Sequence, residues 1–357
     1  MRTRTPAAVA QWIEYWPPKP RVVGLIPASR TIQRMPFDFD AVTAPFRMQP
    51  GLRKLAPGAS QLTANRIGDR ALREKVEVLT HHADAALLCV PEFNAEPAIQ
   101  ALLRHAAREH PDAIQLASDG SVGAAHLGWM LRGTVFSGTG PANIGHCLAA
   151  IPAQWRLAAL MCLAFAEDFA LIEATGGRIP WMAVCLPSHW VPRDKIGLVF
   201  TQVHALVADN QTLLAAGEHL ARLVTGEPRW ERFVWTITNN ASLDNHPLRV
   251  PKQEWPAEYQ ADAWQLVAAA VWRTERQTFI PLPELGQAVF AIHVQVTPLA
   301  QAVGAPAQAR AVHAALGSMS QAVLDYRGLM PARKRLLQWL EERAGAGGAG
   351  LTSSPAP

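Results

Sequence analysis

The stretch "VWRTERQTFIPLPELGQAVFAIHVQVTPL" (residues 271–299) contains two runs of strand-forming residues separated by a short loop. The runs 271–280 and 287–299 are rich in Val, Ile, Thr, Phe and Trp, the residues that favour strands. The intervening "PLPELG" supplies the Pro and Gly that are typical of turns. The pattern therefore predicts a β-hairpin.

The first run of this hairpin carries an unusual row of polar side chains. Successive strand residues point to opposite faces, so Arg273, Glu275 and Gln277 share one face and Arg276 lies on the other. Such a row indicates either an edge strand in water or a strand that lines a polar cavity. From the pattern alone, the edge strand is the favoured interpretation.

Helical spacing of apolar residues appears on both sides of the strand-rich middle of the chain. It predicts helices over 68–82, 97–110, 194–207 and 210–226, and again through 306–343. Further strands are expected at 179–187 and 232–240. Strands in the middle with helices before and after predict an α+β fold with a largely antiparallel sheet and flanking helices.

The expected domain organisation has four parts. They are an extended N-terminal arm (1–45), one main domain (46–330), a C-terminal helix (331–343) and a disordered Gly/Ala/Ser/Pro tail (344–357).

Composition excludes several classes of protein. Of the 357 residues, 49% are hydrophobic and 17% are charged, which argues for a packed core and against global disorder. The net charge of +4 is scattered, so no nucleic-acid surface is expected. The apolar run 157–166 is too short to span a bilayer, and the start of the chain lacks the pattern of a secretory signal. We expect a soluble cytoplasmic protein without nucleic-acid or membrane partners.

Cysteines and glycines give no strong motif. The four cysteines, Cys89, Cys147, Cys162 and Cys185, form no C-x-x-C pair, which argues against a zinc or iron–sulfur site and for four buried reduced thiols. The segment "GTGPANIGH" (138–146) lacks the G-x-G-x-x-G spacing of a dinucleotide site, so a surface loop is expected there.

Histidines and tryptophans leave a choice open. His204 lies among apolar residues, as a haem-ligating neutral imidazole would, although a single histidine of this kind is more often structural. The 12 tryptophans fit either a core built on large aromatic residues or a flat pocket for a planar cofactor.

Eight segments taken together resemble a known family. In chain order they are "FRMQPGLRKL" (46–55), "AEDFALIEA" (166–174), "AVCLPSHWVPRDKIG" (183–197), "VHALVAD" (203–209), "RFVWTI" (232–237), "WRTERQTFIPLP" (272–283), "VFAIHVQVTPL" (289–299) and "YRGL" (326–329). This series is similar to that of the haem-dependent oxidative N-demethylases and covers roughly residues 45–330.

The resemblance implies a PAS-like sheet that holds haem b. It also implies a monooxygenase reaction in which O2 oxidises a small secondary amine such as dimethylamine and formaldehyde is released. Electrons would come from an external flavin/iron–sulfur reductase, since this chain has no motif for either carrier. Two alternatives remain: a non-catalytic haem-binding PAS-like sensor, and a structural oxygenase subunit.

The resemblance also assigns roles to individual residues. It makes His204 the axial iron ligand, and it places Arg232, Trp235 and His189 in the cofactor pocket. Arg273 or Arg276 would neutralise the haem propionates, since guanidinium matches a carboxylate, and both would belong to the cofactor pocket.

The substrate side of the expected site comes from the same strand. Glu275 would bind the protonated amine, for which a carboxylate is the natural partner, and Gln277 would orient oxygen or water. Asp209 and Glu173 are weaker candidates for the amine.

This sequence departs from the family pattern near the expected pocket. It has His189 where the family mostly has Gly, Val234 where Asn is usual, Leu206 in place of a Pro, and His293 where Arg is frequent. A second axial ligand, His189 or His293, would block oxygen.

Overall fold

The computed structural model describes residues 37–258 and 260–345. Among these residues, one seven-stranded sheet has the order β1-β9-β10-β11-β7-β8-β2. The bounds of its strands are β1 Arg53–Lys54, β2 Leu87–Cys89, β7 Asp168–Glu173, β8 Trp181–Ala183, β9 Trp230–Thr238, β10 Val271–Leu282 and β11 Gln287–Pro298. Every pairing between these strands is antiparallel, which confirms the predicted α+β class.

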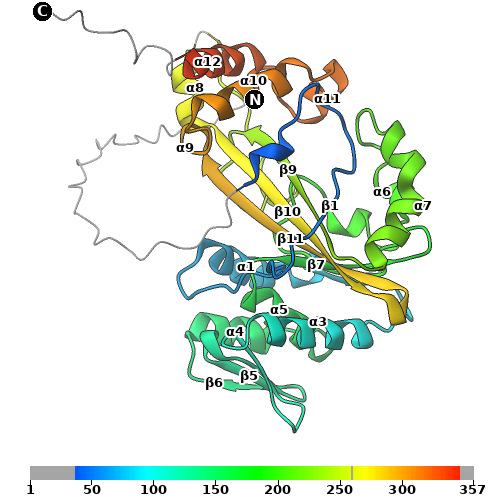
Figure 1. Ribbon diagram of the computed structural model, residues 1–357. Coiled ribbons are helices and arrows are strands. Elements are labelled where there is room, and N and C mark those ends of the chain that lie inside the picture. The colour runs from blue at the N-terminus through cyan, green and yellow to red at the C-terminus, as the bar shows by residue number, and fades with distance from the viewer. Residues whose placement is uncertain (1–36, 259, 346–357) are drawn as a thin grey trace, which may run out of the picture. The chain divides into compact units, whose positions relative to one another are not determined.

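The predicted hairpin is confirmed and provides the two longest strands (Figure 1). β10 and β11 pair in unbroken register from Val271↔Pro298 to Leu282↔Gln287. A short 3-10 helix, Pro283–Leu285, and Gly286 in the left-handed region close the turn. β10 also pairs with β9 along nine residue pairs, so it is a central strand, and the edge-strand interpretation is wrong.

Helices cover the sheet on several sides. Their bounds are α1 Arg70–His81, α2 Ala83–Ala86, α3 Glu96–Glu109, α4 Ala142–Ala150, α5 Arg156–Ala164, α6 Phe200–Val203, α7 Gln211–Thr225, α8 Ala263–Ala269, α9 Leu299–Ala302, α10 Pro306–Gly317, α11 Gln321–Tyr326 and α12 Arg333–Gly345. One core packs α1, α3, α4 and α5 against β7, β8 and the turn end of the hairpin. A second core packs α8, α10 and α12 around Trp235 and Trp272, at the end of the hairpin opposite its turn.

The first core contains a fully buried ion pair. Lys75 Nζ of α1 lies 3.0 Å from Asp168 Oδ1 of β7, and the two side chains are 0% and 1% exposed. Lys75 also donates hydrogen bonds to the carbonyl oxygens of Phe165 and Glu167, and Asp168 accepts one from the backbone N–H of Leu186. This network ties α1 to β7 and to the segment after β8.

A second, four-stranded sheet was not predicted. Its strands β3 Ile114–Leu116, β4 Val122–Ala124, β5 Trp129–Arg132 and β6 Val135–Gly138 are short and pair in chain order. The surface-loop prediction for 138–146 is wrong over most of its length, because α4 begins at Ala142 and buries Ile144. Its glycines serve close packing: a Cβ on Gly140 would collide with the carbonyl oxygen of Leu127 and with the Trp129 ring.

Three further expectations need correction or limits. Over 194–207 only Phe200–Val203 is α-helical, since Gly197 adopts φ 79° and interrupts the expected helix. Cys89 is exposed, so only three of the four cysteines are buried. Residues 1–36 of the expected arm and 346–357 of the expected tail lie outside the described residues, while Val42 is buried in the second core.

Gly140 gives a stability prediction. Gly140→Ala should lower the free energy of unfolding by about 1–3 kcal/mol, because the added methyl group overlaps backbone that cannot move freely. Gly304→Ala is the matched control, since a Cβ there meets only ordinary contact, 3.5 Å from the Gln301 oxygen. Urea unfolding of both variants checks this, and equal midpoints would contradict the packing argument.

Candidate functional site

The strand register divides the predicted site residues between two faces of the sheet. Residues directly opposite one another share a face, and Glu275 pairs with Val234 and Val294 while Gln277 pairs with Arg232 and Ile292. Arg273, Glu275, Gln277 and Arg232 therefore lie together. We call this side the polar face.

Arg276 and Trp235 lie on the opposite face. Arg276 Nε and Nη2 both lie 2.9 Å from Glu231 Oε2, and Glu231 also pairs with Arg53. Trp235 stacks on Trp272 with ring centroids 4.7 Å apart in the second core. The carboxylate of Glu231 thus already neutralises Arg276, and Trp235 has a packing partner in the core.

Arg273 is on the polar face but is occupied by the protein. Its Nε donates to Ser188 Oγ at 2.9 Å, and its two terminal nitrogens donate to the carbonyl oxygens of Ser242 and Leu243 at 2.8 Å. A longer bond of 3.4 Å reaches Pro187 O. Arg273 therefore joins the loops at 187–188 and 242–243, and this role differs from the expected propionate contact.

Glu275 and Arg232 form the charged centre of the polar face. Glu275 is partly buried, and its Oε2 accepts a hydrogen bond of 2.6 Å from Gln277 Nε2. Arg232 is partly exposed as a whole, yet its Nε is buried and has no hydrogen-bond partner among the described residues. Burial lowers the pKa of Arg232, and attraction to Glu275 opposes that effect. A buried guanidinium nitrogen without a partner can donate to a bound anion.

A second arginine without an ion-pair partner among the described residues, Arg327, received no role from the sequence, and it lies 5.5 Å from the ring centroid of Trp235. Arg327 follows α11, donates to Trp235 O at 2.6 Å and lies over the Phe46 ring at 4.6 Å. Burial lowers its pKa to about 10, and the nearby positive charge of Arg232 contributes to the decrease. No carboxylate among the described residues forms an ion pair with Arg327 or Arg232. The two motifs "FRMQPGLRKL" and "YRGL", far apart in the chain, meet at this contact, which pattern spacing alone could not show.

His204 has the protonation pattern of a metal ligand. It caps the C-terminus of α6, and its Nδ1 lies 2.8 Å from the carbonyl oxygen of Phe200. Because that oxygen can only accept, Nδ1 carries the proton and the lone pair stays on Nε2. Burial lowers the pKa of His204, and the positive charges of Arg232 and Lys195 lower it further, which outweighs the hydrogen bond to Phe200. The imidazole is therefore neutral near pH 7.

The two other histidines considered as ligands lie elsewhere. His293 is opposite Arg276 on the other face of the sheet, and its Nδ1 is 3.3 Å from Glu167 Oε1. His189 is exposed on the loop after β8 and adopts φ 64°, the left-handed region that favours glycine. This backbone conformation explains why glycine suits that position. Among the described residues, no hydrogen bond or ion pair joins the His189 side chain to the polar face.

The two weaker candidates for amine binding have partners of their own. Asp209 Oδ2 accepts a hydrogen bond of 2.6 Å from Ser320, the residue that caps α11. Glu173 Oε2 lies 3.5 Å from Arg178. Neither residue replaces Glu275 at the polar face.

Some of the side chains near the polar face are of the types that a haem needs from a protein. Among the described residues, no group of three or more His, Cys, Asp or Glu side chains could hold a metal ion. A haem iron needs only an axial ligand from the protein, because the porphyrin supplies the remaining nitrogens. His204 offers such a ligand, while Arg232 and Arg327 offer unused positive charge for propionates. No described helix is long and apolar enough to cross a membrane.

A family model matches most of the chain. The model of the family described as "Haem-dependent oxidative N-demethylase, alpha subunit-like" matches residues 69–337. The match includes β7 to β11, α6 with His204, and Arg327 after α11. It covers about three quarters of the chain and confirms the family expected from the eight motifs. The chain belongs to the haem-dependent oxidative N-demethylase, alpha subunit-like family.

Proposed function

We propose that this protein is the haem-binding component of an oxidative N-demethylase that acts on a small secondary amine such as dimethylamine. The single observation that carries the proposal is His204, a neutral imidazole whose Nδ1 faces a carbonyl oxygen and whose Nε2 keeps the lone pair, near the polar face that holds Arg232 with its unpartnered Nε. Family membership supports the reaction class.

The strand order supports a PAS-like sheet for this proposal. Strands β7 to β11 are arranged β8-β7-β11-β10-β9, which is 2-1-5-4-3 in chain order, as in PAS domains. α6 and α7 fall between the second and third of these strands, where PAS domains carry the helices that cover a ligand. His204 is at the end of α6, so it belongs to that cover.

In the proposed site, the chain's residues bind and orient. His204 would hold the iron through Nε2, with Phe200 O fixing the ring and its proton. Arg232 and Arg327 would pair with the propionates. Arg273 and Arg276 are less suited to this role, because Arg273 is bonded to Ser188 and Arg276 is paired with Glu231. Arg273 positions the two loops beside the site.

Glu275 would take the protonated amine. Two valines, Val234 and Val294, stand on either side of it across the strands and limit its contact with water. Gln277 holds one carboxylate oxygen at 2.6 Å, so the other oxygen is free to accept from the ammonium group.

The reaction requires more than this chain. A bound haem would supply oxygen activation: one oxygen atom enters a methyl C–H bond, the other leaves as water, and two electrons and two protons are consumed. The oxidised methyl group is then released as formaldehyde, and a primary amine remains. We propose that an external flavin/iron–sulfur reductase delivers the electrons, since the family description names an alpha subunit.

Replacement of the proposed ligand tests the assignment. His204→Ala should lower haem content at least tenfold, or convert the spectrum to that of a haem without a histidine ligand, because His293 lies on the other face of the sheet and His189 is exposed on a loop. Haem is measured by absorption and by a pyridine haemochrome assay on purified protein.

His189→Gly is the matched control for this experiment. It relieves the left-handed backbone position, so haem content should be unchanged and stability equal or higher. An unchanged spectrum in His204→Ala would contradict the assignment of His204. Loss of haem in His189→Gly would show that His189 binds the iron, and it would also contradict that assignment.

A further inference from the structure

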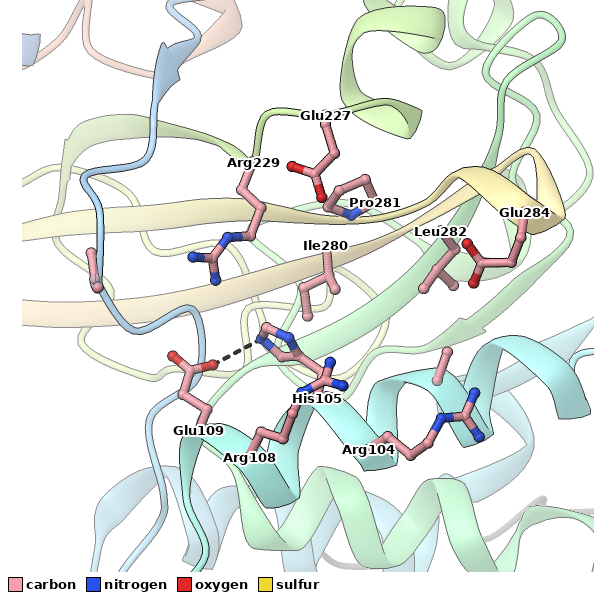
Figure 2. A pocket seen from close by; sticks show the side chains of 13 residues that line it. Arg104, His105, Arg108, Glu109, Glu227, Arg229, Ile280, Pro281, Leu282 and Glu284 are labelled. Carbon is pink, nitrogen blue, oxygen red and sulfur yellow. Dashed lines mark ion pairs between the residues drawn. The ribbon is translucent and has the colours of Figure 1, made fainter.

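A second hollow lies at the turn end of the hairpin, away from the polar face. It has a volume of about 510 Å³ and lies between α3 and residues 280–284, with the loop before β9 as a third wall (Figure 2). None of the residues assigned to the haem site lines it. Its size is within the range typical of small-molecule pockets.

Three arginines line this hollow, and we call it the arginine pocket. Arg104 and Arg108 are four residues apart on α3, and Arg229 comes from the loop before β9. Figure 2 shows Arg229 descending from the loop before β9 and Arg108 rising from α3, with His105 between them in this view. No carboxylate of the described residues forms an ion pair with any of the three, and Arg229 has only a hydrogen bond of 3.2 Å to Gln61 Oε1. Like charges four residues apart weaken a helix, so this pair does not serve α3 itself.

The acidic residues of the pocket do not cancel this charge. Glu109 Oε2 lies 2.9 Å from His105 Nε2, and its other oxygen accepts from the backbone N–H of Gln61. Burial alone would raise the pKa of Glu109, but the hydrogen bonds from His105 and Ser60 hold it below its usual value. Glu109 is therefore ionised, and its two oxygens already face His105 and the backbone N–H of Gln61. Glu227 and Glu284 are exposed, as are Arg104 and Arg108, and neither carboxylate forms an ion pair with the three arginines.

We propose that the arginine pocket binds a phosphorylated small molecule, independently of the haem. Arg108 and Arg229 would hold the phosphate from two sides, since guanidinium groups match phosphate oxygens with paired hydrogen bonds. Pro281 offers an apolar wall for the organic part. The volume of about 510 Å³ suits a small molecule, so we assign the pocket to a small anion.

Calorimetric titration of the holoprotein with inorganic pyrophosphate at low salt tests this proposal. Wild-type protein should bind saturably, and Arg108→Ala/Arg229→Ala should weaken binding at least tenfold, because two charge-assisted contacts are removed. Arg66→Ala is the matched control, since Arg66 is exposed and forms no ion pair among the described residues. It should bind as the wild type does.

A comparison of two further ligands shows whether the pocket recognises the organic part as well as the phosphate. Tighter binding of a nucleoside monophosphate than of inorganic phosphate indicates an organic ligand, and equal binding indicates the free anion. Binding should persist in His204→Ala, so failure of the haem assignment leaves this test intact. No saturable binding at millimolar pyrophosphate, or equal binding by the folded double variant, would overturn the proposal.

Discussion

Lys75→Met is expected to lower the free energy of unfolding by about 3–5 kcal/mol, the usual cost of removing one partner from a buried ion pair. The substitution leaves the Asp168 carboxylate in the core without its counterion. It also removes the donor to the carbonyl oxygens of Phe165 and Glu167, which methionine cannot replace. Burial thus makes this pair far more sensitive than an exposed one.

A double-mutant cycle isolates the pair. The double variant Lys75→Met/Asp168→Asn should lose much less free energy of unfolding than the two single variants lose together, because no charge then remains buried at this site. Arg222→Met is the control, since its pair with Glu218 on α7 is mostly exposed and should contribute less than about 0.5 kcal/mol. A loss below about 1 kcal/mol in Lys75→Met would contradict the account of this core.

Glu275→Gln is expected to lower kcat/KM for a secondary amine by about tenfold to a hundredfold, the range of one hydrogen bond to a charged group. Glutamine keeps the shape of the side chain and the contact with Gln277, but it has no charge for the ammonium group. Haem content should stay as in the wild type. The measurement is formaldehyde release from purified holoprotein with a chemical or enzymatic reductant.

Glu173→Gln is the matched control for the charge at Glu275. Glu173 ends β7 and pairs with Arg178, so its replacement should leave the reaction nearly unchanged. Full activity in Glu275→Gln would remove Glu275 from the amine site, and loss of haem there would show a structural role.

The centre of the large sheet could be predicted from the sequence because β9, β10 and β11 are long and carry strong local signals. The hairpin 271–299 has a turn rich in Pro and Gly between two strand-forming runs, and β9 alternates before Asn239 and Asn240. The second sheet was missed because strands of three or four residues, one of them containing Gly123, give no readable period.

The site was predictable only in part, since side-chain partners depend on contacts distant in the chain. Alternation correctly separated Arg276 from Arg273, Glu275 and Gln277. It could not show that Arg276 pairs with Glu231, because that residue lies 45 positions earlier on the neighbouring strand. Arg327 was missed for the same reason: its aromatic partner Phe46 is near the other end of the described chain.

The most direct test of the central claim is the absorption spectrum of the purified wild-type protein, oxidised and reduced, with and without dimethylamine. The proposal predicts a haem spectrum with one histidine ligand and an open position, which shifts saturably when the amine is added. A colourless protein after haem-supplemented expression would contradict it. So would a haem with two protein ligands that does not respond to the amine.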